Sequence, residues 1–129
     1  MILAGDIGGT NARLALYEAR DGKLEQAIET VFPSRQHSGL DEIVAKFVDQ
    51  LTMQELPKPE AACFGIAGPV VNGRSETSNL PWVVESTQLA AVLDLPKTLL
   101  INDLEANAWG IATLSGDEFK TLFRPCEIP

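Results

Sequence analysis

Two short apolar runs constrain the fold of this 129-residue chain more than any other feature. The first covers residues 61–67 (AACFGIA), the second covers residues 98–101 (TLLI), and neither has a helical period. Continuous apolar runs of this length are typical of strands that are covered on both faces, as in parallel sheets. Between them lies a helical segment, residues 88–95, with Ser86 as its candidate cap and Pro96 after its end. A strand, a helix and a second strand in this order predict an α/β architecture.

The N-terminal part of the chain has the pattern of three strands joined by short turns. Residues 2–7 are apolar without a helical period, and residues 12–18 alternate apolar and other side chains. Asp21-Gly22 is a strong hairpin signal, after which residues 23–32 form a third, more exposed strand. Hairpins followed by alternating helices and strands imply a mixed sheet with helices on its faces.

The remaining elements complete the predicted order β-β-β-α-β-α-β-α. Ser38, with Asp41 three residues later, indicates a helix start, and apolar residues follow at helical spacing on one stripe: Leu40, Ile43, Val44, Phe47, Val48 and Leu51. Residues 70–82 (VVNGRSETSNLPW) predict an extra hairpin with Asn72-Gly73 at its tip. A third helix is expected over about residues 104–114.

Charge and cysteine content exclude several classes of function. The net charge of −8 argues against nucleic acid or an anionic membrane as the main partner. An anionic ligand would then be held by backbone N–H groups or through a metal ion. The two cysteines, Cys63 and Cys126, are too few and too far apart for a disulfide scaffold. Without a signal peptide or a bilayer-spanning stretch, a cytoplasmic, reduced protein is expected.

The turn after the first predicted strand carries the first candidate site. Gly8 and Gly9 can adopt unusual backbone angles and lack side chains, so backbone N–H groups there could meet a phosphate. Thr10 and Asn11 add polar side chains at the rim, and Asp6 could hold a hydrated Mg²⁺ ion. The pattern matches neither the P-loop nor the dinucleotide fingerprint, so a plain hairpin remains an equal alternative.

The second candidate site follows the second apolar run. Asn102 and Asp103 stand at the carboxyl end of that strand, where α/β sheets bind ligands. Both residue types also cap helices for purely structural reasons, whereas an Asp here could accept the proton of a substrate hydroxyl. Ala67 and Gly68 end a neighbouring strand with small residues, and Asn79 could bond a sugar hydroxyl or only shape a turn.

Four stretches together carry a resemblance that none carries alone. LAGDIGGTNARLALYE, GIAGP, SNLPW and INDLEANA, in this order and spacing, resemble the N-terminal small domain of bacterial glucokinases. Those enzymes belong to the hexokinase, actin and heat-shock-chaperone ATPase superfamily. The resemblance covers residues 1–115, which would form the small domain, and it implies a ribonuclease-H-like α/β fold with a mixed five-stranded sheet.

The resemblance implies a role for each matching position. Asp6 is similar to the acid associated with Mg²⁺, and the turn that embraces the phosphates of ATP matches Gly8, Gly9, Thr10 and Asn11. Asn102 matches a residue that binds glucose hydroxyls, and Asp103 resembles the base that takes the proton of the 6-hydroxyl. The sugar pocket would also be lined by Ala67, Gly68 and Asn79.

Members of that family are much longer than this chain. Their second half carries the adenosine-binding segment and the remaining sugar ligands, so residues 116–129 are expected to cross toward a large C-terminal domain. The resemblance implies a homodimeric glucokinase that phosphorylates glucose with ATP at the entry to glycolysis, and a fragment that is inactive alone. The alternatives are a sugar-sensing regulator, which usually carries a DNA-binding segment first, and a non-catalytic module on the same scaffold.

Overall fold

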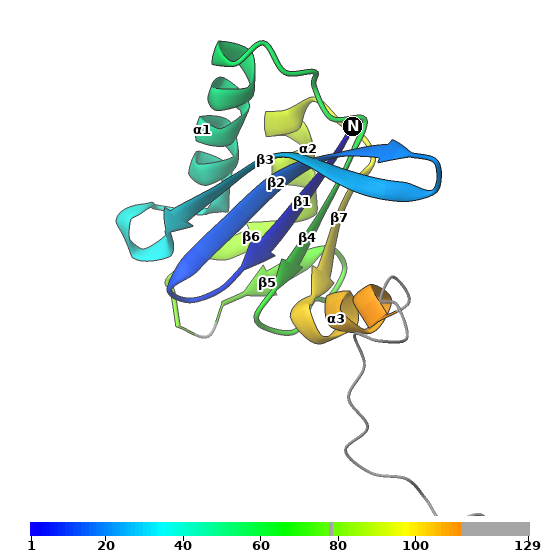
Figure 1. Cartoon of the computed structure of the whole chain (residues 1–129). Helices are drawn as coiled ribbons and strands as arrows, with labels where there is room; N and C mark the ends of the chain where they lie inside the picture. The colour runs from blue at the N-terminus through cyan, green and yellow to red at the C-terminus, as the bar shows by residue number, and fades with distance from the viewer. Residues whose placement is uncertain (78, 112–129) are drawn as a thin grey trace, which may run out of the picture.

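A computed structural model describes residues 1–77 and 79–111 of the chain (Figure 1). The main sheet has five strands in the order β3-β2-β1-β4-β7. These strands are β1 (Ile2–Ile7), β2 (Asn11–Arg20), β3 (Lys23–Pro33), β4 (Ala61–Ile66) and β7 (Thr98–Asn102). The helices are η1 (Ser34–Gln36), α1 (Leu40–Met53), α2 (Ser86–Leu93) and α3 (Asp103–Ile111). The expected crossover over 116–129 and the last residues predicted for the third helix lie outside the described residues.

The sheet is mixed, as the sequence predicts. Strand β2 pairs antiparallel with both β1 and β3, whereas β1, β4 and β7 run parallel to one another. The two apolar runs are therefore parallel neighbours, joined by the crossover that contains α2. The predicted extra hairpin is also present, as the two-stranded sheet of β5 (Arg74–Glu76) and β6 (Val83–Glu85). Asn72-Gly73 makes a tight turn just before β5, and not the tip between the two strands.

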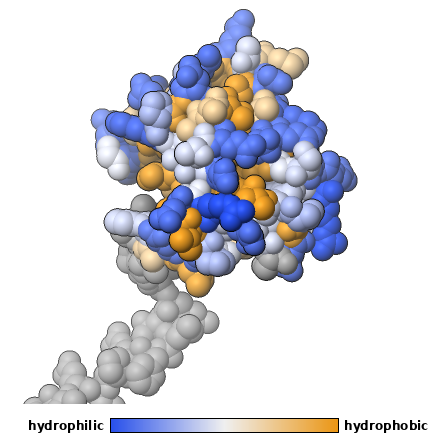
Figure 2. All heavy atoms as spheres, turned by 180° about the vertical axis from the view of Figure 1, so that it is seen from behind, coloured by the Kyte–Doolittle hydropathy of each residue, from blue (hydrophilic) through white to orange (hydrophobic). Residues whose placement is uncertain are grey.

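One face of the main sheet carries the hydrophobic core. Leu3 pairs with Leu16 on one side and with Ala62 on the other, and all three side chains are buried. The apolar stripe predicted for α1 packs here, with Ile43, Val44 and Phe47 fully buried. Seen from behind, hydrophilic residues cover most of the surface and hydrophobic ones show through in separate patches (Figure 2). Burial of this apolar face is the main source of the stability of the fold.

Helix α3 packs against the other face of the sheet, near the carboxyl ends of the parallel strands. Gly65 of β4 makes this possible, because a Cβ atom there would lie only 3.1 Å from the Cβ of Ala106 in α3. Farther along the same face, Leu99 of β7 is 62% exposed. The helix itself exposes the large side chains of Leu104 and Trp109. Gly65 thus permits the close packing that fixes α3 against the end of the sheet.

The helix starts differ in detail from the predicted caps. The residue that bonds Ser38 is Glu42 and not Asp41: the backbone N–H and the hydroxyl of Ser38 each donate to Glu42 Oε2 at 2.8 Å. The two bonds, and Lys46 beside the carboxylate, lower the pKa of Glu42 from 4.5 to about 2. Ser86 is the first residue of α2, and the cap position is occupied by Glu85 without a side-chain bond.

Two turns of the hairpin type have the backbone conformation that their sequences predict. Asp21 and Gly22 have φ values of 51° and 74°, and Asn72 and Gly73 have φ values of 52° and 72°. Two successive positive φ values define the type I′ turn, which Asp-Gly and Asn-Gly favour. Within the described part of the chain, no helix is both long enough and apolar enough to cross a membrane.

Candidate active site

The carboxyl ends of the three parallel strands meet at one edge of the sheet. Ile7, Ile66 and Asn102 occupy the same register position on β1, β4 and β7. Directly after them come the loop of residues 8–11, the pair Ala67-Gly68, and Asp103. The structure therefore brings together the strand ends that the sequence analysis selected separately. This edge is where open α/β sheets form their ligand sites.

The loop of residues 8–11, the β1–β2 loop, is closed by one backbone bond. The Gly8 N–H donates to the Asn11 carbonyl at 2.9 Å. The N–H groups of Gly9 and Thr10 have no acceptor among the residues that the structure describes. Two free N–H groups side by side in a loop are what a backbone anion site requires.

The two glycines of this loop are needed for space, and not for backbone angles. Neither Gly8 nor Gly9 has a positive φ, so neither uses the left-handed backbone that favours glycine. A Cβ atom on Gly9 would lie 3.1 Å from the Cβ of Asn79, and one on Gly8 would lie 3.2 Å from the Asn11 carbonyl oxygen. Side chains here would therefore press on the neighbouring loop or on the β1–β2 loop itself.

Ser34 holds the β1–β2 loop, although the sequence analysis did not select it. Its hydroxyl donates to the Gly8 carbonyl at 2.8 Å, and its N–H donates to the Thr10 carbonyl at 2.9 Å. The side chain is fully buried. A single serine after a strand carries no signal of this contact, because its partner lies 26 positions away in the sequence.

Asn79 reaches the same edge from the connection between β5 and β6. It lines a small pocket with Gly9, Ala67 and Thr77, whose free volume of about 10 Å³ is close to the size of one water molecule. The Thr77 hydroxyl donates to the Leu80 carbonyl at 3.0 Å and so shapes the turn that carries Asn79. This pocket is too small for a sugar, which would have to bind outside it.

Asn102 joins two of the strand ends and caps α3. Its Nδ2 donates to the Gly68 carbonyl at 2.6 Å, and its Oδ1 accepts the Leu104 N–H at 3.0 Å. The structural role considered for this pair, a helix cap, is thus carried by Asn102. One N–H and one lone pair of its amide stay available for a ligand.

One carboxylate oxygen of Asp103 is available for a ligand. Its Oδ1 accepts the same Leu104 N–H at 2.9 Å, and its Oδ2 has no hydrogen bond from the described residues. Because Asn102 already caps the helix, the carboxylate of Asp103 is not required for that purpose. It can therefore accept a proton from a substrate.

Asp6 supplies a second available carboxylate on the same face of the sheet. It is exposed, and it pairs in register with Gly65, whose missing side chain would lie 3.9 Å from the Asp103 Cα. The basic residue opposite it, Arg13, forms its ion pair with Glu29 at 3.3 Å instead. Among the described residues, the side chain of Asp6 has no ion-pair or hydrogen-bond partner. Asp6 and Asp103 thus both lie next to Gly65.

Other reactive groups do not extend this site. The described residues contain no group of three or more His, Cys, Asp or Glu side chains that could hold a metal ion. Cys63 is a free, half-buried thiol whose pKa is raised by burial and by the negative charge of Glu105. A raised pKa keeps the thiol protonated and unreactive at neutral pH. Cys126 lies outside the described residues.

Solved structures with the same architecture are sugar kinases of the actin-like ATPase fold. The glucokinase of an Antarctic psychrotroph superposes with a TM-score of 0.79 and 30% sequence identity over 91% of this chain and 36% of that one. The glucokinase of Balamuthia mandrillaris, solved in complex with glucose, gives a TM-score of 0.66 and 26% identity over 87% of this chain and 32% of that one. The fold class is that of an actin-like sugar kinase.

Sequence comparison narrows the class to one family. The glucokinase family model matches residues 3–127, so the chain belongs to the glucokinase family. The glucokinase of Nostoc punctiforme is 36% identical over 123 residues, which are 95% of this chain and 35% of the relative. The glucokinase of Zymomonas mobilis is 34% identical over 127 residues, which are 98% of this chain and 38% of the relative. The chain thus spans just over a third of the length of these relatives.

Proposed function

We propose that residues 1–115 form the small domain of an ATP-dependent glucokinase, which phosphorylates the 6-hydroxyl of glucose. The observation that carries the proposal is the single edge of the sheet that holds two free loop N–H groups and two available carboxylates. Membership of the glucokinase family supports it. The remaining length of the relatives would complete the site, with residues 116–129 leading toward it.

The β1–β2 loop fits the phosphates of ATP. Gly9 and Thr10 offer N–H donors, and the glycines leave room for an anion to approach the backbone. Thr10 and Asn11 are exposed and add polar side chains at the rim. In a protein of net charge −8, such local donors are the means to hold a polyphosphate.

Asp6 fits a Mg²⁺ ion bound together with the nucleotide. Mg²⁺ keeps several waters and is usually held by one or two carboxylates plus substrate phosphates, which suits a lone exposed Asp beside a phosphate loop. The ion, when bound, would neutralise charge on the phosphates during transfer. Asp6 would hold it through its unpaired carboxylate oxygens, directly or through water.

Asp103 would act as the general base. Its free Oδ2 would accept the proton of the sugar 6-hydroxyl as the oxygen of that hydroxyl attacks the terminal phosphorus of ATP, and the bond from this phosphorus to the bridging oxygen breaks so that ADP leaves. The bond from the Leu104 N–H to Oδ1 keeps the carboxylate in place at the first turn of α3. The first turn of a helix carries the positive end of the helix dipole, which attracts a negatively charged carboxylate.

Sugar binding would be shared by the residues around Asp103. Asn102 has one N–H and one lone pair left for hydroxyl groups, and Asn79 reaches the same edge beside Gly9. Ala67 and Gly68 would let the sugar approach the backbone at the end of β4. Glucose, rather than another hexose, is proposed from the family and from the glucose complex of the Balamuthia relative.

The whole protein is proposed to be a cytoplasmic homodimer that needs both halves for activity. Phosphoryl transfer depends on positioning both substrates, and this chain supplies only one side of that arrangement. The test is ATP-dependent formation of glucose 6-phosphate by the full-length protein and by residues 1–129 alone. We expect turnover from the full-length protein only. Rapid turnover by residues 1–129, or none by either protein, would contradict the proposal.

A sugar-sensing regulator or a non-catalytic module is the second candidate function. The free Oδ2 of Asp103 favours the kinase over a module without catalysis, whereas a sugar-sensing regulator would use the same carboxylate to accept a bond from a sugar hydroxyl. Glucose binding without phosphorylation by the full-length protein would favour this candidate.

A further inference from the structure

The segment of residues 33–38, which connects β3 to α1, contacts both loops of the candidate site. We call it the 33–38 strap. We infer that Ser34 of this strap is a positioning residue, which aims the β1–β2 loop at the phosphates of ATP. The inference rests on the proposed glucokinase function. The sequence pattern alone does not predict the contacts of Ser34.

Ser34 determines the direction of a peptide group in the β1–β2 loop. In a trans peptide the C=O and the next N–H point in opposite directions, and the described residues contain no cis bond. The 2.8 Å bond from the buried Ser34 hydroxyl to the Gly8 carbonyl therefore turns the Gly9 N–H away from the protein interior. The Gly9 N–H, left without an acceptor, is thus directed outward by Ser34.

A second bond from Ser34 fixes the far side of the same loop. Its backbone N–H donates to the Thr10 carbonyl at 2.9 Å. Two of the four carbonyl groups of the loop, those of Gly8 and Thr10, are thus held by one buried residue, while the two N–H groups between them, those of Gly9 and Thr10, have no acceptor among the described residues. Only the bond to Gly8 depends on the side chain, so a substitution at Ser34 removes one contact and keeps the other.

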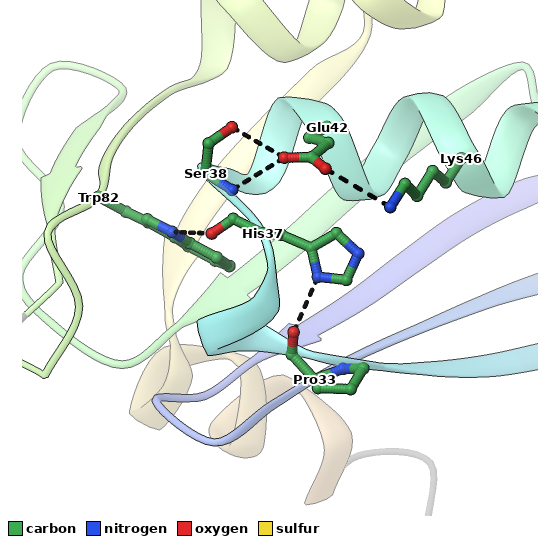
Figure 3. A network of polar contacts seen from close by, with 6 residues as sticks. All are labelled: Pro33, His37, Ser38, Glu42, Lys46 and Trp82. Carbon is green, nitrogen blue, oxygen red and sulfur yellow. Dashed lines mark hydrogen bonds and ion pairs between the residues drawn. The ribbon is translucent and has the colours of Figure 1, made fainter.

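The 33–38 strap is also braced against the loop that carries Asn79 (Figure 3). The buried indole of Trp82 donates its N–H to the His37 carbonyl at 3.1 Å. The His37 ring donates from Nδ1 to the Pro33 carbonyl at 2.8 Å, since a carbonyl can only accept. The His37 N–H donates to the Ser34 carbonyl at 3.2 Å. The strap that holds Ser34 is therefore closed by two hydrogen bonds of its own and tied to the Asn79 loop through the His37 carbonyl.

This arrangement predicts which kinetic constant depends on Ser34. Ser34 touches the β1–β2 loop, whereas the strap reaches the Asn79 loop through the backbone of His37, which a change at Ser34 leaves in place. Loss of the Ser34 hydroxyl should therefore weaken binding of MgATP and slow phosphoryl transfer. The KM for glucose should stay within about twofold of the wild-type value, because the residues proposed to bind the sugar keep their contacts.

Thr98 offers a matched control at the opposite end of the sheet. Its hydroxyl is also buried and donates to a backbone carbonyl, that of Leu95, at 2.8 Å. Thr98→Val removes this hydroxyl with little change of volume, as Ser34→Ala does at the loop. Both variants lose one buried hydrogen bond, so general destabilisation affects them alike.

The experiment is steady-state kinetics of the full-length glucokinase that carries this chain, with wild type, Ser34→Ala and Thr98→Val. We expect Ser34→Ala to raise the KM for MgATP by about tenfold, because the loss of one hydrogen bond that orients the loop weakens binding by roughly this factor. Thr98→Val should keep both KM values. Hydrogen exchange of the Gly8 amide, which closes the loop, should be faster in Ser34→Ala alone.

Two results would overturn the inference, and they are distinguishable from a failure of the proposed function. Equal KM values for MgATP in Ser34→Ala and wild type would reduce Ser34 to a structural residue, and so would equal losses in the two variants. In both cases the wild type would still phosphorylate glucose. A wild type without this activity would contradict the proposed function, and with it the role of Ser34 in ATP binding.

Discussion

The two ends of β2 carry two glycine-containing connections, and they differ in what the glycines do. At the Asp21–Gly22 turn both residues have positive φ, and a Cβ atom on Gly22 would meet nothing within 4 Å. In the β1–β2 loop neither glycine has a positive φ, yet a Cβ atom on Gly9 would press on Asn79. The first connection is explained by its backbone alone. The second is explained only by its neighbours.

The largest expected effect lies at the candidate active site, at Asp103. Asp103→Asn keeps an oxygen that can accept the Leu104 N–H, so α3 should keep its first turn. The amide cannot take a proton from the sugar, so kcat should fall by about 10²–10⁴-fold, the usual range for loss of a general base. Steady-state kinetics of the full-length protein tests this, with the KM for glucose expected to change little.

Asp21→Asn, in the turn at the other end of β2, is the matched control for this substitution. Asn tolerates the left-handed backbone that Asp21 adopts, so kcat and stability should stay near the wild-type values. If Asp103→Asn retained wild-type kcat, the assignment of Asp103 as the base would be wrong.

The next effect in size distinguishes Gly9 of the β1–β2 loop from Gly22 of the turn at the other end of β2. Gly9→Val places branched carbons where even a Cβ atom lies 3.1 Å from Asn79, so the β1–β2 loop must shift. Overpacking of this kind costs about 1–3 kcal/mol, and we expect the KM for MgATP to rise about tenfold or more. Titration of MgATP in kinetic assays measures this. An unchanged KM would remove the reason given for glycine at this position.

Gly22→Ala should show the reverse pattern. The φ of 74° at Gly22 is unfavourable for alanine, and the substitution should lower the free energy of unfolding by about 1–2 kcal/mol. No site residue is near, so KM and kcat should be those of the wild type. Urea denaturation combined with kinetics makes the comparison, and a change in the KM for MgATP would show that the two turns are not independent.

The smallest effect concerns the start of α1, beside the 33–38 strap. Because the pKa of Glu42 falls from 4.5 to about 2 on folding, its carboxylate contributes stability above pH 4.5. That contribution is lost as the pH falls from about 4.5 toward 2. Urea denaturation in this window should show a smaller loss of stability for Glu42→Gln than for wild type. Equal pH dependence in the two proteins would contradict the assigned bonds from Ser38.

Local patterns were sufficient to predict most of the fold. The Asp21–Gly22 turn and the strand of residues 98–101 depend on short-range preferences, so their sequence patterns identify them. The start of α1 was predicted to within a residue, but its bonding partner was wrong because the longer Glu42 side chain reaches back to Ser38. Such a detail depends on side-chain reach rather than on spacing alone.

The candidate site was predictable where residues stand at strand ends and not where they act across the chain. Asp6 was selected because it lies at the end of a strand beside a glycine turn, and Asp103 because it follows the carboxyl end of a strand, where α/β sheets bind ligands. Ser34 and Gly65 could not be selected, since one acts on Gly8, 26 positions away, and the other makes room for a helix about forty positions later. Contacts of this range are properties of the folded chain.

The most direct test of the account is to observe the loop N–H groups while ATP binds. In NMR spectra of the full-length protein, the amide resonances of Gly9 and Thr10 should shift saturably as MgATP is added. The amide of Gly22 should stay where it is, because its turn lies at the opposite end of β2. Unchanged Gly9 and Thr10 resonances at saturating MgATP would contradict the claim that this loop binds phosphate.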